Sequence, residues 1–204
     1  MIIKTILILI FVYLLGSISG SIIISKNFFR EDIRLKGSGN AGTTNAFRAY
    51  GVKYAALAMS IDFIKTILAM LIADKVGLAV GASEFTKYIS GVVVVIGHIW
   101  PIYYNFKGGK GVATTGGGMG FLYPNMFLVG CAIFFGISAI TGYVSLGSIS
   151  LMIYLLYLFI FVLKLTGFEL LFACLTVVLV IFKHRENIKR LINKRERSIY
   201  KGRK

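Results

Sequence analysis

Runs of about 20 consecutive apolar residues limit the folds open to this chain more than any other feature of its sequence. The first run, MIIKTILILIFVYLLGSISGSIII, covers residues 1–24, and residues 112–182 are almost wholly apolar. Apolar residues make up 57% of the 204 residues, above the roughly 45–50% of a soluble domain. Only helices and closed barrels satisfy their own backbone in a bilayer. We therefore predict an all-α integral membrane protein.

Polar interruptions divide the apolar sequence into seven expected transmembrane helices. The first run is too long for a signal peptide and lacks an Ala-x-Ala-like cleavage site, so we interpret it as the first helix. Two more are expected at about 52–73 and 88–104, with Pro101 loosening the end of the latter. The breaks YPN (123–125), TGY (141–143) and KLTG (164–167) give four further helices, the first of them short. Seven crossings leave no room for a second domain, so residues 1–204 are expected to form one.

The distribution of charge predicts the orientation in the membrane. Of the 23 Lys and Arg residues, ten lie in residues 183–204 and six in residues 26–53, next to apolar spans. Cytoplasmic flanks of membrane helices are rich in these residues. We therefore expect a cytoplasmic C-terminus, an N-terminus outside, and a multi-pass protein of the plasma membrane. The same pattern accounts for the net charge of +15 without nucleic-acid binding.

Charged and metal-binding residue types are sparse within the spans. Asp62 and Lys65 lie three residues apart, on one helical face. We favour a structural ion pair over a catalytic role, although such residues also mark ion paths in transporters. Cys131 and Cys174 read as small core residues. No metal site and no cofactor are expected, because neither histidine has a cysteine or carboxylate cluster nearby.

Two glycine-rich segments suit phosphate groups. In NFKGGKGVATTGGG (105–118), glycines let backbone amides form an anion-binding nest beside a lysine. The segment is not a Walker A loop, because Gly111 follows Lys110 where a hydroxyl is required. Close helix packing is the alternative reason for such glycines. GSGNAGTTN (37–45) adds neutral donors, and Arg48 suits bidentate phosphate recognition; the alternative is an ordinary turn-rich loop.

The predicted topology places the unusual segments at one membrane face. With the N-terminus outside, residues 25–51, 97–118, 141–148 and 183–204 face the cytoplasm, and the nearly neutral residues 74–87 face out. The tail opens with KHRENIKRL, which also reads as a basic helix attracted to anionic lipid. Two phosphate-suited loops and a histidine at the bilayer edge indicate an enzyme for two phosphorylated substrates, at least one carrying an acyl chain.

Three of these segments resemble the motifs of a known family. GSGNAGTTN (37–45), GHIWPIYYNFKGGKGVAT (97–114) and HRENIKRL (184–191) are similar to the three motifs of the PlsY family, and YVSLGSI (143–149) to a further family stretch. The motifs occur in family order over essentially the whole chain. The resemblance implies a seven-helix bacterial inner-membrane acyltransferase with a cytoplasmic active site. Its partners would be acyl phosphate, glycerol-3-phosphate and membrane lipid, and its products lysophosphatidic acid and phosphate.

The resemblance also implies roles for individual residues. The first motif would line the site with Ser38, Asn40, Thr44 and Asn45, and Arg48 would bind the phosphate of glycerol-3-phosphate. Lys110 with Gly108, Gly109 and Gly111 would hold the acyl phosphate. Ser148, or alternatively Ser145, would add a hydroxyl, and His184 and Asn187 would complete the site. Thr43 stands where the family often has alanine.

The donor implied by the resemblance agrees with a missing motif. Acyltransferases that use thioesters commonly carry His-x-x-x-x-Asp, but Tyr103 and Lys189 stand five residues after the two histidines. An acyl phosphate is already activated, so orientation and charge stabilisation can suffice. We expect the hydroxyl proton to pass to the donor's phosphate with His184 assisting, in preference to His184 as the base. His98 reads as a structural donor. The rival function is a small transporter or lipid-binding scaffold, although no inverted repeat is visible.

Overall fold

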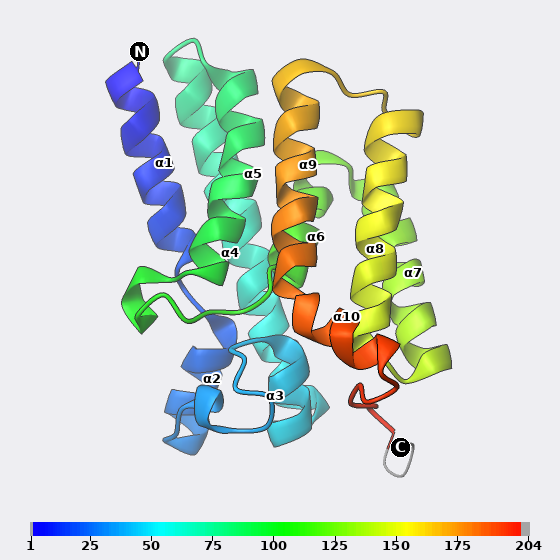
Figure 1. Cartoon of the computed structure of the whole chain (residues 1–204). Helices are drawn as coiled ribbons and strands as arrows, with labels where there is room; N and C mark the ends of the chain where they lie inside the picture. The colour runs from blue at the N-terminus through cyan, green and yellow to red at the C-terminus, as the bar shows by residue number, and fades with distance from the viewer. Residues whose placement is uncertain (1, 201–204) are drawn as a thin grey trace. The chain divides into compact units, whose positions relative to one another are not determined.

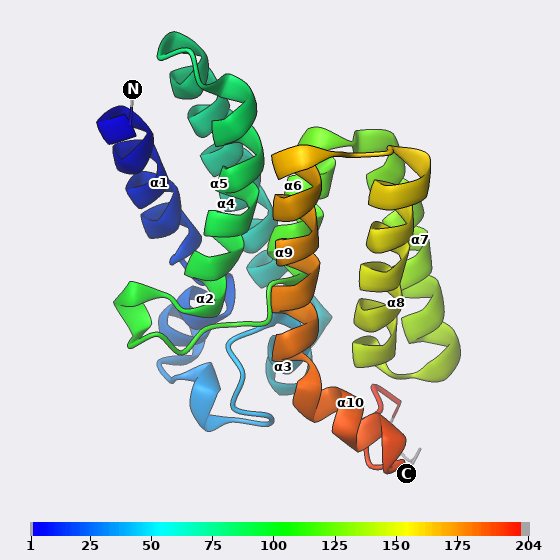
Figure 2. The ribbon, with the colours of Figure 1, turned by 45° about the horizontal axis from the view of Figure 1, so that its top comes forward.

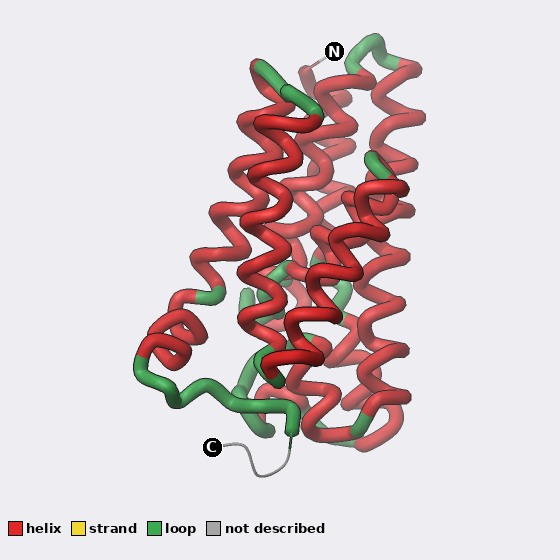
Figure 3. Tube along the Cα trace, turned by 90° about the vertical axis from the view of Figure 1, so that its right-hand side faces the viewer, coloured by secondary structure: helices red, strands yellow, loops and turns green. Residues whose placement is uncertain are grey.

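The computed structural model describes residues 2–200, and every regular element within them is helical (Figures 1 and 3). This confirms the prediction of an all-α fold. The α-helices are α1 (Ile2–Gly16), α2 (Gly20–Phe29), α3 (Thr43–Tyr50), α4 (Val52–Ala79), α5 (Ser83–Ile99), α6 (Val112–Leu122), α7 (Pro124–Thr141), α8 (Val144–Tyr157), α9 (Gly167–Lys183) and α10 (Arg185–Ile192). Two 3₁₀ turns (Ile33–Leu35 and Ile102–Tyr104) and a π-helical turn (Leu158–Val162) complete the list.

The described chain forms two compact units that divide after Leu122. The first unit contains α1 to α6 and the second α7 to α10. The expectation of a single domain over 1–204 stays a prediction.

Close helix packing in the first unit depends on small residues. Helices α1, α4 and α5 run side by side in Figures 1 and 2 and contact one another. A methyl group on Gly16 would lie 2.6 Å from the Val94 carbonyl oxygen, and one on Gly97 would lie 2.6 Å from that of Tyr13. The backbones of α1 and α5 therefore approach at a distance that only glycine permits, as is common between membrane helices. Beside this crossing, a buried apolar cluster joins the three helices: Ile8, Val12, Ala69, Ala73 and Val94.

The remaining helices of the first unit pack on α4. Helices α2 and α3 contact it near its beginning, and α6 contacts it further along. Gly117 of α6 brings the two backbones together, because a methyl group there would lie 2.7 Å from the Phe63 carbonyl oxygen. The polar loop between α2 and α3 and the glycine loop before α6 are thereby anchored to the same long helix.

The second unit is built on the α7–α8 pair. The two helices are joined by a tight turn at Gly142 (φ 77°) and Tyr143, and Gly147 of α8 lies against α7 beside Phe134 and Ser138. Helix α9 packs on α8, and α10 contacts both (Figure 1). After α10 the chain returns to the turn, where the Ile199 amide donates to the Gly142 carbonyl at 2.8 Å.

Two expectations about local structure were wrong. The first apolar run is not one straight helix, because α1 and α2 meet at a bend of 41° around residues 17–19. Residues 25–51 are not only loop: α2 continues to Phe29, and α3 begins at Thr43. In contrast, the breaks predicted at 123–125, 141–143 and 164–167 coincide with helix boundaries. Helix α5 ends at Ile99, two residues before Pro101, because the residue before proline disfavours helical geometry.

The number of candidate membrane crossings differs between the sequence and the structure. Among the described residues, four helices or helix pairs are long and apolar enough to cross a membrane alone: Val52–Ala79, Glu84–Tyr104, Pro124–Thr141 and Val144–Val162. Two bent pairs, α1 with α2 and α9 with α10, raise this to six. The 11 residues of α6 fall short of the roughly 20 that a crossing needs. Seven crossings and the orientation of the termini therefore remain predictions.

Candidate active site

The first polar loop, residues 37–42, is shaped around the buried side chain of Asn45. The amide Nδ2 of Asn45 donates to the carbonyl oxygens of Ile33, Lys36 and Asn40 at 3.1, 2.9 and 3.1 Å. Its Oδ1 accepts from the Ser38 amide at 3.0 Å. With 2% of its surface exposed, Asn45 is committed to the loop backbone on both ends of its side chain. The predicted substrate-binding residue thus determines the loop's conformation.

Helix α3 presents its N-terminus and Arg48 next to this loop. The helix begins at Thr43 after Gly42, which provides no side-chain cap. A helix N-terminus carries partial positive charge from amides without intrahelical acceptors, so it favours anions. Thr44 and Arg48 are four residues apart and share one helical face. Both side chains are half-buried.

Two ion pairs hold the loop that leads to residues 37–42. Arg34 contacts Asp32 through Nε and Nη2, at 2.7 Å for the shortest contact, and its Nη1 donates to the Tyr104 carbonyl at 2.7 Å. Hydrogen bonding to Arg34 holds the pKa of Asp32 below its ordinary value. Glu31 pairs with Lys36 at 2.6 Å, which lowers the pKa of that carboxyl as well. Both carboxylates are therefore ionised at neutral pH and neutralised by neighbouring cations.

The glycine loop, residues 108–111, folds back on the end of α5. The amides of Gly108 and Gly109 donate to the carbonyls of Ile99 and His98 at 3.2 and 3.1 Å. These two amides thus donate within the protein, and phosphate binding by the glycine loop stays a prediction. Gly111 adopts φ 92°, and its carbonyl accepts from the Thr115 amide and the Thr114 hydroxyl, both at 2.8 Å. Lys110 stands two residues before α6, which begins at Val112 and whose first amides have no acceptor within the helix.

The structure brings the first two predicted motifs together. Asn40 Nδ2 donates to the Gly108 carbonyl at 3.4 Å, and Arg34 ties the first loop to Tyr104. The segments 34–48 and 98–111 are therefore neighbours within the first unit, although about 60 residues separate them in the chain. Arg34 and His98 belong to this arrangement, but no pattern in the sequence predicted a role for Arg34.

The second unit contains the other predicted residues around His184, which separates α9 from α10. Its Nδ1 lies 2.8 Å from the Val180 carbonyl oxygen, and the ring is 3% exposed. A carbonyl can only accept, so Nδ1 carries a proton, and in the neutral ring Nε2 has the lone pair. Asn187 Nδ2 donates to Glu196 Oε1 at 2.8 Å, and Arg190 Nε donates to Oε2 at 2.8 Å. The sequence did not single out Glu196, since one carboxylate in a basic tail gives no signal.

The two candidate serines of α8 differ in their hydrogen bonding. Ser148 is 3% exposed, and its hydroxyl donates to the Val144 carbonyl at 2.9 Å. Ser145 is 6% exposed, and its Oγ has no hydrogen-bond partner among the described residues. The alternative between the two predicted serines therefore stays open: Ser148 has already donated its hydroxyl proton, whereas Ser145 has not.

Comparisons with known proteins agree with the motifs. The profile of the family described as glycerol-3-phosphate acyltransferase matches residues 6–194. Curated proteins named glycerol-3-phosphate acyltransferase are 42% identical in Finegoldia magna, with 93% of both chains covered, and 40% identical in Bacillus subtilis, with 93% of this chain and 95% of the relative covered.

Two crystal structures share the fold. Both are described as PlsY, an integral membrane glycerol 3-phosphate acyltransferase. The glycerol 3-phosphate form is 38% identical with a TM-score of 0.87, and covers 96% of both chains. The lysophosphatidic acid form is 37% identical with a TM-score of 0.84, and the match covers 98% of this chain and 97% of that one. The present chain is thus similar over nearly its full length to proteins that are all described as glycerol-3-phosphate acyltransferases.

Proposed function

The chain belongs to the glycerol-3-phosphate acyltransferase family, and from this premise we propose that it transfers a fatty acyl group from acyl phosphate to the 1-hydroxyl of glycerol-3-phosphate. The products are lysophosphatidic acid and inorganic phosphate, so the reaction is the first acylation of phospholipid synthesis. The observation that carries this proposal is the full-length likeness to two solved forms, one described with glycerol 3-phosphate and one with lysophosphatidic acid. One molecule is the acceptor and the other the product of the proposed reaction.

The first unit supplies the phosphate-binding groups of the proposal. Lys110, the amide of Gly111 and the first amides of α6 hold the phosphate of the donor and stabilise the charge that collects on it as it leaves. Arg48 binds the phosphate of glycerol-3-phosphate, with Ser38 and Thr44 as neutral donors. The groups whose hydrogen bonds are already made hold the loops in shape: Asn40, Asn45, Gly108 and Gly109.

The second unit supplies His184, Asn187 and a serine of α8. The hydroxyl oxygen of glycerol-3-phosphate attacks the acyl carbon, a new ester C–O bond forms, and the C–O bond to phosphate breaks. The hydroxyl proton leaves with the phosphate. His184 accepts a hydrogen bond from the reacting hydroxyl at Nε2, since Nδ1 donates to Val180. Asn187, fixed by Glu196, orients a substrate oxygen.

The membrane setting of the proposal follows from charge. Ten cations in residues 183–204 favour a cytoplasmic C-terminus in a bacterial plasma membrane. Seven crossings then leave the N-terminus outside and both phosphate-suited loops in the cytoplasm, where glycerol-3-phosphate is soluble. The acyl chain of the donor lies among the helices.

A donor comparison on the purified protein tests the proposal. The full chain in detergent micelles is incubated with radiolabelled glycerol-3-phosphate and, in parallel, with acyl phosphate, acyl-CoA or acyl carrier protein of the same chain length. We expect labelled lysophosphatidic acid with acyl phosphate alone. Product from a thioester but not from acyl phosphate would leave the family intact and overturn the donor. No product from any donor would favour the transporter or scaffold.

A further inference from the structure

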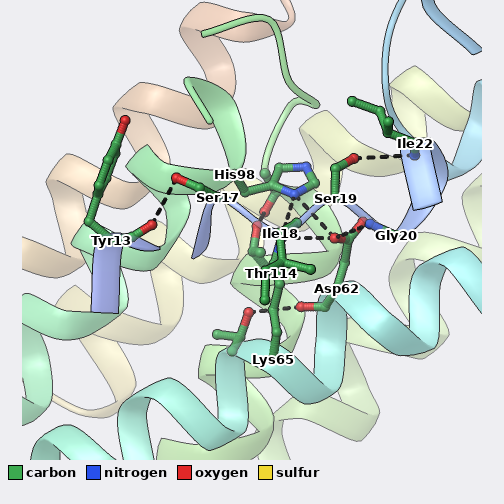
Figure 4. Close-up of polar contacts among 12 residues, drawn as sticks. Tyr13, Ser17, Ile18, Ser19, Gly20, Ile22, Asp62, Lys65, His98 and Thr114 are labelled. Atoms are coloured by element: carbon green, nitrogen blue, oxygen red, sulfur yellow. Dashed lines mark hydrogen bonds and ion pairs between the residues drawn. The ribbon is translucent and has the colours of Figure 1, made fainter. Parts of the chain in front are cut away.

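A buried ion pair in α4 forms hydrogen bonds with backbone groups at the break between α1 and α2 (Figure 4). Lys65 Nζ lies 2.8 Å from Asp62 Oδ1, and the two side chains are 4% and 1% exposed. The bend leaves backbone groups without helical partners, and each charge takes one: Asp62 Oδ1 accepts from the Gly20 amide at 3.2 Å, and Lys65 donates to the Ile18 carbonyl. In an apolar layer such backbone groups require partners. These contacts give the pair a structural role at the break.

His98 of α5 connects the pair to the glycine loop. Its Nδ1 lies 3.1 Å from Lys65 Nζ and 3.4 Å from Asp62 Oδ1, and the ring is 3% exposed. An ammonium group can only donate, so Nδ1 accepts from Lys65 and the proton is on Nε2. In Figure 4 the ring lies above the two charged side chains. The pair therefore fixes the orientation of the imidazole.

The other edge of this imidazole lies against Gly109. A methyl group on Gly109 would overlap His98 Nε2 and approach Cε1 to 2.9 Å. The main chain of His98 holds the same residue, because its carbonyl accepts from the Gly109 amide at 3.1 Å. His98 therefore positions Gly109 through both its ring and its backbone. Lys110 follows directly in the chain.

We propose that Asp62, Lys65 and His98 form a positioning cluster that places Gly109 so that Lys110 and the following amides meet a substrate phosphate. None of the three residues touches the substrate. The cluster links the helix break, through α4 and α5, to the loop. The identity of the phosphate ligand rests on the proposed function above. Binding groups must be placed closely, because a misplacement of about 1 Å can cost about 100-fold in rate.

A double-mutant cycle tests the contact between the ring and the loop. Gly109→Ala pushes a methyl group into the imidazole, and we expect KM for the substrate held by the loop to rise by about tenfold or more. His98→Asn shortens the side chain yet keeps an acceptor for Lys65, so it opens space for that methyl group. The double variant should then be no worse than Gly109→Ala alone. If the increases in KM of the two single variants multiply in the double variant, the proposed contact is overturned.

A matched control and a second variant separate positioning from stability. Gly118→Ala in α6 places its methyl group 3.5 Å from Met70 Sδ, an ordinary contact, and should leave both KM values unchanged. His98→Gln removes the acceptor for Lys65. If the cluster only stabilised the fold, this variant would lower the unfolding temperature and the active fraction while KM stayed constant. A raised KM in the folded fraction supports positioning, and constant KM for both substrates overturns it.

A binding measurement keeps the inference separate from the proposed reaction. Inorganic phosphate should raise the unfolding temperature of the wild-type protein, and His98→Gln should weaken this response. If the protein is inactive with acyl phosphate, but phosphate raises the unfolding temperature of the wild type more than that of His98→Gln, the result would contradict the proposed donor and support the cluster. A raised KM for glycerol-3-phosphate instead of acyl phosphate would support the cluster and reassign the loop's substrate. No response in the wild type, or an equal one in both proteins, would overturn the cluster.

Discussion

At the scale of single residues, the candidate site depends on side chains whose hydrogen bonds are made within the protein. Asn45 is the clearest case, because its amide group contacts four backbone groups of one loop. A residue type that suits substrate binding in the sequence therefore serves the shape of the binding loop. Sequence patterns identify such a residue but not the partner of its side chain.

Replacing Asn45 should unfold the first loop. In Asn45→Asp a carboxylate would face the carbonyls of Ile33, Lys36 and Asn40, to which it cannot donate. Buried carbonyls left without donors cost about 1–3 kcal/mol each, so we expect thermal unfolding in micelles to shift by several degrees or more. Asn40→Ala is the control, since it removes one hydrogen bond of 3.4 Å and should cost about 1 kcal/mol or less. Equal stability of Asn45→Asp and wild type would contradict this account.

His184 offers a second residue-level prediction, through the pH dependence of the rate. If His184 only assists as a hydrogen-bond acceptor, protonation of its ring at low pH should lower kcat only to a plateau, because the reaction does not need it as a base. His184→Gln should then retain measurable turnover, reduced by about tenfold to 100-fold for a lost charge-free hydrogen bond and its orientation. A wild-type kcat that keeps falling with pH without a plateau, together with no measurable turnover in His184→Gln, would show that the histidine acts as the base.

At the scale of helices, apolar runs and breakers predicted most of the elements. Pro101, Pro124 and Gly142 mark boundaries because proline removes a backbone donor and glycine allows a left-handed turn. The break between α1 and α2 was missed, and its backbone groups bond to Asp62 and Lys65, about 45 residues further along. Helix α3 was missed because its short polar sequence follows glycines typical of a loop.

Glycines at helix crossings give a prediction about packing. Gly97→Ala adds a methyl group 2.6 Å from the Tyr13 carbonyl oxygen, where the backbones of α1 and α5 meet. We expect a loss of about 1–3 kcal/mol from overpacking. Gly136→Ala in α7 is matched in chemistry, but apart from its chain neighbours and the helix's own backbone, nothing lies within 4 Å of its added methyl group. Alanine is the better helix former, so this control should be neutral or gain up to about 1 kcal/mol. Thermal unfolding of both variants in one detergent compares them.

At the scale of the whole molecule, the charge distribution predicts which side of the membrane each polar segment faces, whereas helix lengths alone do not. The segment 74–87 contains Asp74, Lys75, Glu84 and Lys87 and is nearly neutral, whereas residues 183–204 hold ten cations. Positive-inside bias therefore assigns the two segments to opposite sides. Helix α6, with 11 residues, is the element on which the parity of the crossings depends.

Labelling of single cysteines in intact cells tests this topology. In a background with Cys131 and Cys174 changed to serine, one cysteine is introduced at Leu35, Ile192, Glu84 or Ile3, all of which have exposed side chains. An impermeant maleimide should react with the variants at 84 and 3 in intact spheroplasts, and with those at 35 and 192 only after the membrane is opened. An odd number of crossings requires that the cysteines at positions 3 and 192 be labelled from opposite sides of the membrane. If 35 and 192 label from different sides, the first motif and His184 cannot serve one cytoplasmic reaction, because no substrate hydroxyl could reach both.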